Sequence, residues 1–240
     1  MLDLESTKGI IFDYGGTIDT DGMHWSEVLW MAYGALKIPV DKDTFRLAYV
    51  HGERTLAKEP IIQPKHNFWH VLRLKAETQI QWLLDNDYLT DEGEFKKYTT
   101  GIADWCYAYV QTVISGTAPI LKKLAEKYPM VLVTNFYGNM GAVLKDYHME
   151  TYFKAIVESA VVGVRKPDSA IFKLGISQLG FAPEDVIVIG DSYDKDIVPA
   201  TKAGCKTIWL KGIGWKEYTG EETTDCVISH FAELKYLFKL

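Results

Sequence analysis

The chain has 240 residues, of which 48% are hydrophobic and 24% charged, with a net charge of −6 and an isoelectric point near 5.5. This composition is typical of soluble globular proteins and disfavours the fibrous and intrinsically disordered classes. The acidic balance argues against a broad basic face that grips nucleic acid, so we expect no nucleic-acid partner. The length suffices for one α/β domain with a large insertion or for two modest domains.

The N-terminal residues, MLDLESTKGIIF, are acidic and polar and do not resemble a signal peptide. No apolar run reaches the roughly 20 residues that a membrane helix needs. The three cysteines, Cys106, Cys205 and Cys226, are widely spaced, which favours reduced thiols over a disulfide framework or a zinc cluster. We therefore expect a cytoplasmic protein with no membrane partner.

The first predicted element is a strand over residues 9–12, with the sequence GIIF. It is apolar throughout, as strands are when helices cover both faces of a parallel sheet. The strand is followed by one carboxylate, Asp13, and two glycines then precede Thr17. Ligands bind beyond the carboxyl ends of the strands in an open parallel sheet, so this stretch is a candidate for the active site.

About 110 residues with helical patterns separate this strand from the next one. We predict that residues 20–115 form an α-helical cap domain, inserted into a core made of residues 1–19 and 116–240. Five of the seven tryptophans lie in the insertion, and their spacing favours packing inside it. The four helices predicted there span residues 24–37, 42–58, 65–86 and 92–114.

One stretch of the insertion, residues 51–70, concentrates basic and aromatic side chains. These groups either complement an anionic or sugar-like substrate or form an ordinary solvated face. Its histidines do not show a spacing that predicts a metal site. The basic residues of the stretch are His51, Arg54, Lys58, Lys65, His66 and His70.

Strands and helices alternate along the rest of the chain, which predicts an α/β fold with a doubly wound parallel sheet, a Rossmann-like core. The predicted helices carry apolar residues at intervals of three and four and span residues 118–128, 139–148 and 168–180. The predicted strands span residues 130–134, 155–157, 186–190, 206–210 and 226–228.

Polar side chains lie at the ends of three of the predicted strands. Asp13 follows the first strand, Thr134 and Asn135 end the run MVLVTN, and Asp191 follows the run VIVIG. A turn with Lys166 lies between the last two runs in the chain. Because parallel strands end at the same edge of a sheet, we expect these groups to meet at one site.

These residue types suit phosphoryl transfer. Asp13, Asp191 and Asp196 offer the oxygen ligands that Mg²⁺ prefers, and one carboxylate can attack phosphorus to form an acyl-phosphate that water hydrolyses. The hydroxyl of Thr134 and the ammonium of Lys166 complement the charge of the phosphoryl group. Each residue also has a purely structural interpretation: Asp196 caps a helix, Lys166 is a turn lysine, and Thr134 closes a strand.

In order and spacing, these residues resemble the four motifs of the haloacid dehalogenase-like superfamily, which consists mostly of magnesium-dependent phosphohydrolases. The resemblance covers residues 8–19 and 116–240, and the insertion corresponds to the helical cap that closes over the active site in one subgroup. The matching residues are Asp13-Tyr14-Gly15-Gly16-Thr17, Thr134-Asn135, Lys166-Pro167 and GDSYDKDIVPATKAG at 190–204.

The resemblance implies a role for most of these residues. Asp13 is implied to be the nucleophile, with Thr134 and Lys166 as further catalytic groups. Asp13, Asp191 and the carbonyl of Gly15 are implied to hold Mg²⁺, and Asp196 to support the metal site. The implied substrate-binding residues are Gly16, Thr17, Thr134, Asn135 and Lys166.

Gly15 departs from the family pattern, because phosphatases of the family carry an aspartate there that protonates the leaving alcohol. Asp19, Asp21, His24 or Glu27 could take over this proton transfer when the cap closes. Alternatively, the leaving group is a good one, the enzyme runs another reaction of the family, its turnover is weak, or catalysis is lost and the chain binds a phosphorylated ligand or a protein partner.

We predict from the sequence a Mg²⁺-dependent phosphatase that acts on a small phosphorylated metabolite through an aspartyl-phosphate on Asp13. The oligomeric state is either a monomer or a homodimer, since aromatic residues of the cap fit both.

Overall fold

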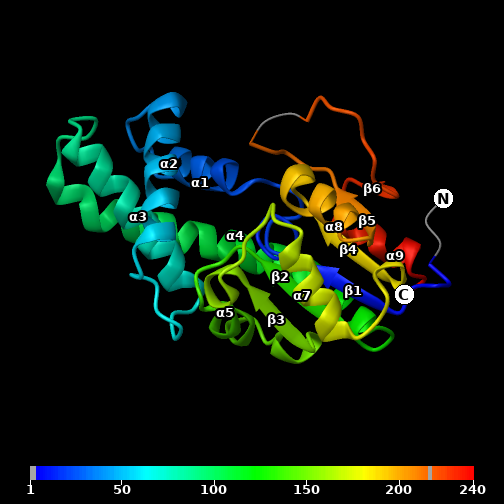
Figure 1. Cartoon of the computed structure of the whole chain (residues 1–240). Coiled ribbons are helices and arrows are strands. Elements are labelled where there is room, and N and C mark those ends of the chain that lie inside the picture. Colours follow the sequence, from blue (N-terminus) through cyan, green and yellow to red (C-terminus); the bar gives the residue numbers. More distant parts are fainter. Residues whose placement is uncertain (1–3, 216–217) are drawn as a thin grey trace.

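The computed structural model describes residues 4–215 and 218–240. Six parallel strands form one sheet in the order β3-β2-β1-β4-β5-β6, which confirms the predicted α/β fold (Figure 1). All six predicted strands are present, and only β3 is longer than expected, by one residue. Their bounds are β1 (Gly9–Phe12), β2 (Met130–Thr134), β3 (Ala155–Glu158), β4 (Val186–Gly190), β5 (Lys206–Leu210) and β6 (Cys226–Ile228).

The three central strands, β1, β2 and β4, are buried on both faces along their whole length, which explains why they are almost entirely apolar. On β1, Ile11 belongs to the core cluster of one face, while Ile10 and Phe12 belong to the cluster of the other. Helix α7 (Ala170–Leu179) lies close against the first face, because a Cβ atom at Gly175 would come within 2.7 Å of the side chain of Val133.

The remaining helical elements of the core are short. One turn of π-helix, η4 (Tyr193–Ile197), follows β4 and leads directly into α8. The others are α5 (Met140–Asp146), α6 (Ser159–Val162), α8 (Val198–Lys202) and α9 (Leu234–Leu237), with 3₁₀ turns η2 (Glu150–Tyr152), η3 (Pro183–Asp185) and η5 (Phe231–Glu233); one further 3₁₀ turn, η1 (Glu92–Glu94), lies in the inserted segment.

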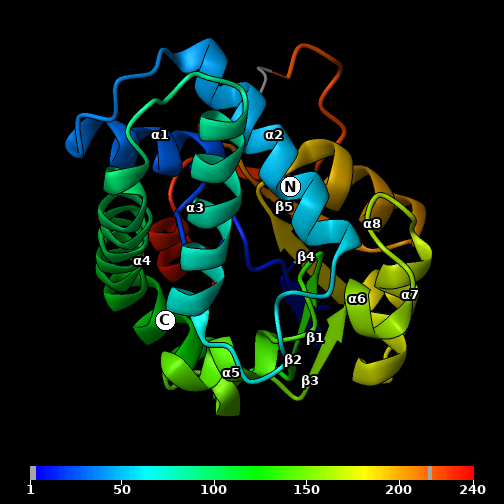
Figure 2. The ribbon, with the colours of Figure 1, turned by 90° about the vertical axis from the view of Figure 1, so that its left-hand side faces the viewer.

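The inserted segment is helical, as predicted, and lies to one side of the sheet (Figures 1 and 2). Polar residues start two of its helices, because the side chains of Asp41 and Asn67 accept hydrogen bonds from the backbone N–H groups of Thr44 and His70. The helices are α1 (Trp25–Ala35), α2 (Lys42–Lys58), α3 (Phe68–Asp85) and α4 (Phe95–Ala125).

Helix α4 differs from the prediction, because one helix of 31 residues replaces the two helices expected at 92–114 and 118–128. Pro119 lies inside it and removes one backbone hydrogen bond. The buried side chains of Ile120, Leu121 and Leu124 pack beyond the proline and hold the chain helical. The predicted boundary between cap and core at residues 115 and 116 falls inside this helix, and the division into two domains stays a prediction.

A single apolar cluster joins the cap helices to the sheet, since Val28 and Leu72 belong to the same cluster as Ile10 and Phe12. The three cysteines are unpaired, as expected. Among residues 4–215 and 218–240, no helix is both long and apolar enough to cross a membrane.

Candidate active site

The candidate site lies where the order of the strands reverses. In this sheet the reversal falls between β1 and β4, and crevices at such points bind ligands in α/β proteins. Asp13 follows β1 directly, Asp191 follows β4, and Asp196 lies on the π-helical turn after β4. The sheet therefore brings together carboxylates that are nearly 180 residues apart in the chain.

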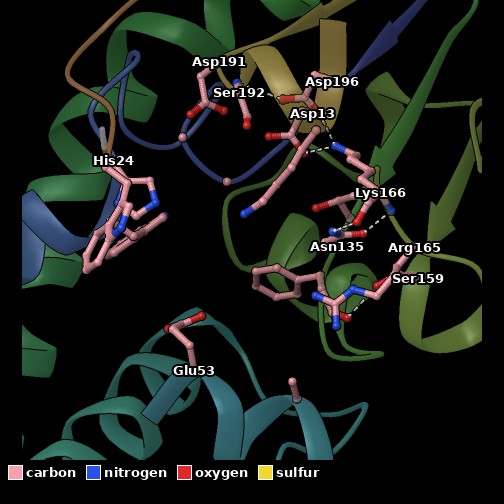
Figure 3. Close-up of a pocket in the computed structure, with 18 of the residues that line it drawn as sticks. Asp13, His24, Glu53, Asn135, Ser159, Arg165, Lys166, Asp191, Ser192 and Asp196 are labelled. Atoms are coloured by element: carbon pink, nitrogen blue, oxygen red, sulfur yellow. Dashed lines mark hydrogen bonds and ion pairs between the residues drawn. The ribbon is translucent and has the colours of Figure 1, made fainter. Parts of the chain in front are cut away.

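Three carboxylates and one ammonium form the centre of the site (Figure 3). One oxygen from each of Asp13, Asp191 and Asp196 lies within 4.8 Å of the other two. The Nζ atom of Lys166 is 2.5 Å from Oδ1 of Asp13 and 2.7 Å from Oδ1 of Asp196. A single ammonium thus faces three acidic groups, and the four side chains carry a net negative charge when ionised.

Two glycines allow this close arrangement. A Cβ atom at Gly16, which has a φ of 100°, would lie 2.5 Å from Cγ of Asp191. A Cβ atom at Gly190 would lie 2.5 Å from Cγ of Asp196. A larger residue at either position would displace a carboxylate of the cluster.

Neighbouring side chains fix the orientation of these groups. Asn135 accepts a hydrogen bond from the backbone N–H of Lys166, at 2.9 Å, and donates one to its carbonyl, at 3.0 Å. The hydroxyl of Thr17 donates to Oδ1 of Asp191 at 3.1 Å and lies 3.3 Å from Oδ2 of Asp13. Asn135 and Thr17, predicted as substrate ligands, thus contact the protein's own site residues.

Burial shifts the ionisation of the cluster. It raises the pKa of Asp13 to about 6, since the attraction of Lys166 only partly offsets the loss of water and the charge of Asp196 adds to the rise. Burial and the charges of Asp13 and Asp196 raise the pKa of Asp191. Burial acts to lower the pKa of Lys166, but the two aspartates outweigh it and raise the pKa above its ordinary value.

A cavity of about 1280 Å³ extends from this cluster to the cap helices. In Figure 3 the four charged groups lie on one side of the cavity, and Glu53 of α2 points into it from the opposite side. The cavity is also lined by Gly15, Gly16, Thr134 and Asn135. Of the predicted site residues, only Thr17 does not line the cavity, because it is fully buried behind the carboxylates.

The space beside Gly15 is bordered by Trp25 of α1. A Cβ atom at Gly15 would meet only Nε1 of Trp25, at 3.9 Å, which is an ordinary contact. That indole N–H donates to Asp19 at 3.0 Å, and the other carboxylate oxygen of Asp19 accepts from the backbone N–H of Gly16 at 2.7 Å. Burial raises the pKa of Asp19 to about 7, but its side chain is fully buried behind the indole.

Two other candidates for acid–base work point away from the cluster. Asp21 accepts a hydrogen bond from the backbone N–H of Phe231 at 2.6 Å, and Glu27 pairs with Lys42 at 2.6 Å. His24 does line the cavity, but its Nδ1 accepts a hydrogen bond from the backbone N–H of Ser26, so the side chain caps the N-terminus of helix α1. Its ring proton therefore lies on Nε2, which leaves no basic nitrogen for the cavity.

The partly buried His24 predicts a pH dependence of stability. Burial, with the positive charge of Lys195, lowers the pKa of His24 to about 4. Between that value and the unfolded value of about 6.5, the unfolded chain binds a proton that the folded chain does not, so stability falls as the pH falls through this window. We expect the loss from this residue to be about 1 to 2 kcal/mol, because the ring is partly exposed.

Urea unfolding of the wild type and of His24→Asn, at pH values of about 7.5 and 4.5, measures this effect. Asparagine can also accept the hydrogen bond from Ser26 but does not titrate. The wild type should lose more stability on acidification than the variant, and equal losses would contradict the buried neutral histidine.

The basic residues of the predicted cap stretch, residues 51–70, lie partly in the cavity and partly at the cap surface. Arg54 and Lys58 line the cavity, whereas His66 and His70 stack on each other at the cap surface, with ring centroids 5.3 Å apart. His51 lies against Trp82, away from the cluster. The sequence analysis missed Glu53, Lys75 and Tyr137, which line the cavity from three separate elements and carry no local signal.

Comparisons with known proteins agree with the motif resemblance. The family model described as haloacid dehalogenase-like hydrolase matches residues 7–204 of this chain. Phosphoglycolate phosphatase from Yersinia pestis is 32% identical over 135 residues, which are 52% of this chain and 58% of that protein. Glyceraldehyde 3-phosphate phosphatase from Methanocaldococcus jannaschii is 31% identical over 88 residues, 37% of this chain and 39% of that protein. The chain thus spans about half the length of the curated relatives it matches.

Among solved structures, the HAD hydrolase YfnB from Bacillus subtilis, bound to magnesium, superposes with a TM-score of 0.61. That alignment covers 98% of this chain and 99% of the other at 18% identity, so it supports the fold alone. The match of the family model, which covers most of the chain, confirms the resemblance that the motifs indicated: the chain belongs to the haloacid dehalogenase-like hydrolase family.

Proposed function

We propose that the chain is a magnesium-dependent phosphatase that acts on a small phosphorylated metabolite, with Asp13 as the nucleophile. The observation that carries this proposal is the cluster of Asp13, Asp191 and Asp196, whose oxygens lie within 4.8 Å of one another at the floor of a large cavity. The phosphatase names of the two curated relatives support the same class of reaction.

The donor set fits Mg²⁺. Its members are carboxylate oxygens, which are the ligands that this hard cation prefers, and Lys166 alone does not balance their charge. Asp13 and Asp191, with the carbonyl of Gly15, would hold the ion, and Asp196 would support the site. When bound, the cation offsets the negative charge of the phosphate as the nucleophile approaches.

In the proposed reaction, an oxygen of Asp13 forms a bond to phosphorus while the ester oxygen leaves. Lys166 orients the Asp13 carboxylate through its hydrogen bond to Oδ1. Thr134 and the backbone at Gly16 line the cavity beside the nucleophile, where they would bind the phosphoryl oxygens. Water then attacks the acyl-phosphate, which releases inorganic phosphate and restores the carboxylate.

Gly15 provides no side chain to protonate the leaving alcohol, which therefore takes its proton from solvent. We expect turnover to depend strongly on the basicity of the leaving group, since proton transfer by a positioned side chain is typically worth about 10² to 10⁴ in rate. The empty position also favours a second candidate, a family member that binds a phosphorylated ligand without turning it over.

Removal of the metal tests the proposed function. Hydrolysis of p-nitrophenyl phosphate by the purified chain should fall at least about 100-fold after chelation and return when Mg²⁺ is added. This substrate has a good leaving group, so its turnover does not require an acid at Gly15. Equal rates with and without the chelator would refute the metal-dependent mechanism, and phosphate binding without any turnover would favour the second candidate.

A further inference from the structure

A second group of polar side chains lies in the wall of the same cavity, opposite the carboxylate cluster. Glu53 of α2 accepts hydrogen bonds from Nζ of Lys75 on α3, at 2.5 Å, and from the hydroxyl of Tyr137, at 3.2 Å. Tyr49, one turn before Glu53 on α2, interacts electrostatically with both members of the ion pair. We call these four residues, all of which line the cavity, the cap polar cluster.

Stability of the fold does not account for this cluster. Lys75 is only 7% exposed, while the side chain of Glu53 is 32% exposed, and burying the ammonium group costs free energy that an apolar side chain of similar size would not. The neighbouring part of the cavity wall carries the apolar side chains of Leu56, Phe68 and Leu72, together with two cationic ones, Arg54 and Lys58. Polar groups that converge beside apolar side chains in a cavity are typical of a site that orients a ligand.

The charges of the cluster restrict what it can bind. A carboxylate or a second phosphate would be repelled by Glu53 and an ammonium group by Lys75, so either ion would have to break the Glu53–Lys75 pair in order to bind to the cluster. Burial acts to lower the pKa of Lys75, but Glu53 and the two tyrosines outweigh it and keep the amine protonated. The cluster therefore offers both donors, from Lys75 and the tyrosines, and acceptors, from Glu53, with no net charge.

A hydroxyl group both donates and accepts hydrogen bonds, so it matches this set of partners. We infer that the cap polar cluster binds the hydroxyl groups of a sugar or polyol monophosphate whose phosphate lies at Asp13. Figure 3 shows Glu53 facing the cavity from the side opposite Asp13, which places the cluster at the far end of the leaving group.

This inference rests on the proposed function for the position of the phosphate, but it concerns the other end of the ligand. Binding energy gained far from the reacting atoms can fix the ester in a reactive position. Such positioning would offset part of the proton transfer that Gly15 does not supply.

Calorimetry and kinetics on the full chain with Mg²⁺ test the inference. A panel of sugar and polyol monophosphates of three to six carbons is compared with inorganic phosphate for binding, and with p-nitrophenyl phosphate for turnover. At least one panel member should bind more tightly than inorganic phosphate. In Glu53→Gln and in Tyr137→Phe, the binding preference for that panel member over inorganic phosphate should fall roughly 10- to 100-fold. The ratio of its kcat/KM to the kcat/KM of p-nitrophenyl phosphate should fall by the same factor.

The matched control is Glu27→Gln, which breaks a cap ion pair of similar length outside this cluster and should leave the preference unchanged. Thermal unfolding of each variant separates a binding defect from a folding defect, and Tyr137→Phe, which retains its ring, gives a second test if Glu53→Gln is unstable.

The outcomes distinguish the two proposals. Turnover of p-nitrophenyl phosphate with no preference for any sugar or polyol ester would overturn the inference and leave the proposed function standing. Preferential binding that the variants abolish, without turnover of any ester, would support the inference and reject the phosphatase. A preference that both variants retain would also overturn the inference.

Discussion

Replacing Asp13 with asparagine is expected to lower turnover of p-nitrophenyl phosphate by roughly 10³-fold or more. The substitution removes the nucleophile that the protein supplies in the proposal, and a neutral amide is both a poor nucleophile and a poor ligand for Mg²⁺. The side chain keeps its shape, and its oxygen can still accept the hydrogen bond from Lys166. The variant should therefore fold, with a thermal midpoint no lower than that of the wild type, because one of three clustered negative charges is gone.

Asp185→Asn is the matched control for this prediction. Asp185 precedes β4 at the opposite end of the strand from Asp191 and pairs with Lys8 at the surface. The same chemical change at that position should leave turnover within about twofold of the wild type, because an exposed ion pair contributes little. Steady-state kinetics of both variants provide the measurement, and a folded Asp13→Asn protein with wild-type turnover would disprove the assignment of the nucleophile.

Introducing an aspartate at Gly15 is expected to raise activity rather than lower it. The backbone at Gly15 is not left-handed, and a Cβ atom there has room, since its nearest neighbour is Nε1 of Trp25 at 3.9 Å. A carboxyl group at this position would lie beside Asp13 and could protonate the leaving oxygen. For esters of basic alcohols we expect a rise of about 10² to 10⁴ in kcat, the usual contribution of general acid catalysis.

The gain should depend on the leaving group, which separates proton transfer from other effects. Across aryl phosphates of rising leaving-group pKa, wild-type kcat should fall steeply and kcat of Gly15→Asp should fall little. Gly15→Asn has nearly the same volume without a proton to give, so it should retain the steep dependence. A flat series for the wild type would mean that another group already acts as the acid.

The sheet and the carboxylate cluster could be predicted because short-range patterns determine them. The central strands β1, β2 and β4 are almost entirely apolar, and each ends at or just before a glycine or a polar residue. The parallel order then brings their ends to one edge. Asp13 and Asp191 are thus placed by the strands that precede them. Their positions follow once the sheet is known to be parallel.

Helix α4 and the cap polar cluster could not be predicted in this way, because tertiary contacts decide both. Pro119 is a local signal for a break, yet packing beyond it keeps the chain helical. Glu53, Lys75 and Tyr137 are 22 and 62 residues apart along the chain, and each is unremarkable among its neighbours. Only the packing of α2 against α3 and the loop after β2 brings them together.

The two connections between the inserted helices and the sheet differ in stiffness, because one of them is the long helix α4. On one side the chain passes through a loop at residues 20–24, while on the other it runs as a continuous helical rod of about 46 Å. Any movement of the inserted helices relative to the sheet would therefore bend helix α4. The helix bends most easily near Pro119, where one backbone hydrogen bond is missing. A movement of the inserted helices relative to the sheet would consequently be coupled to the elastic bending of one helix.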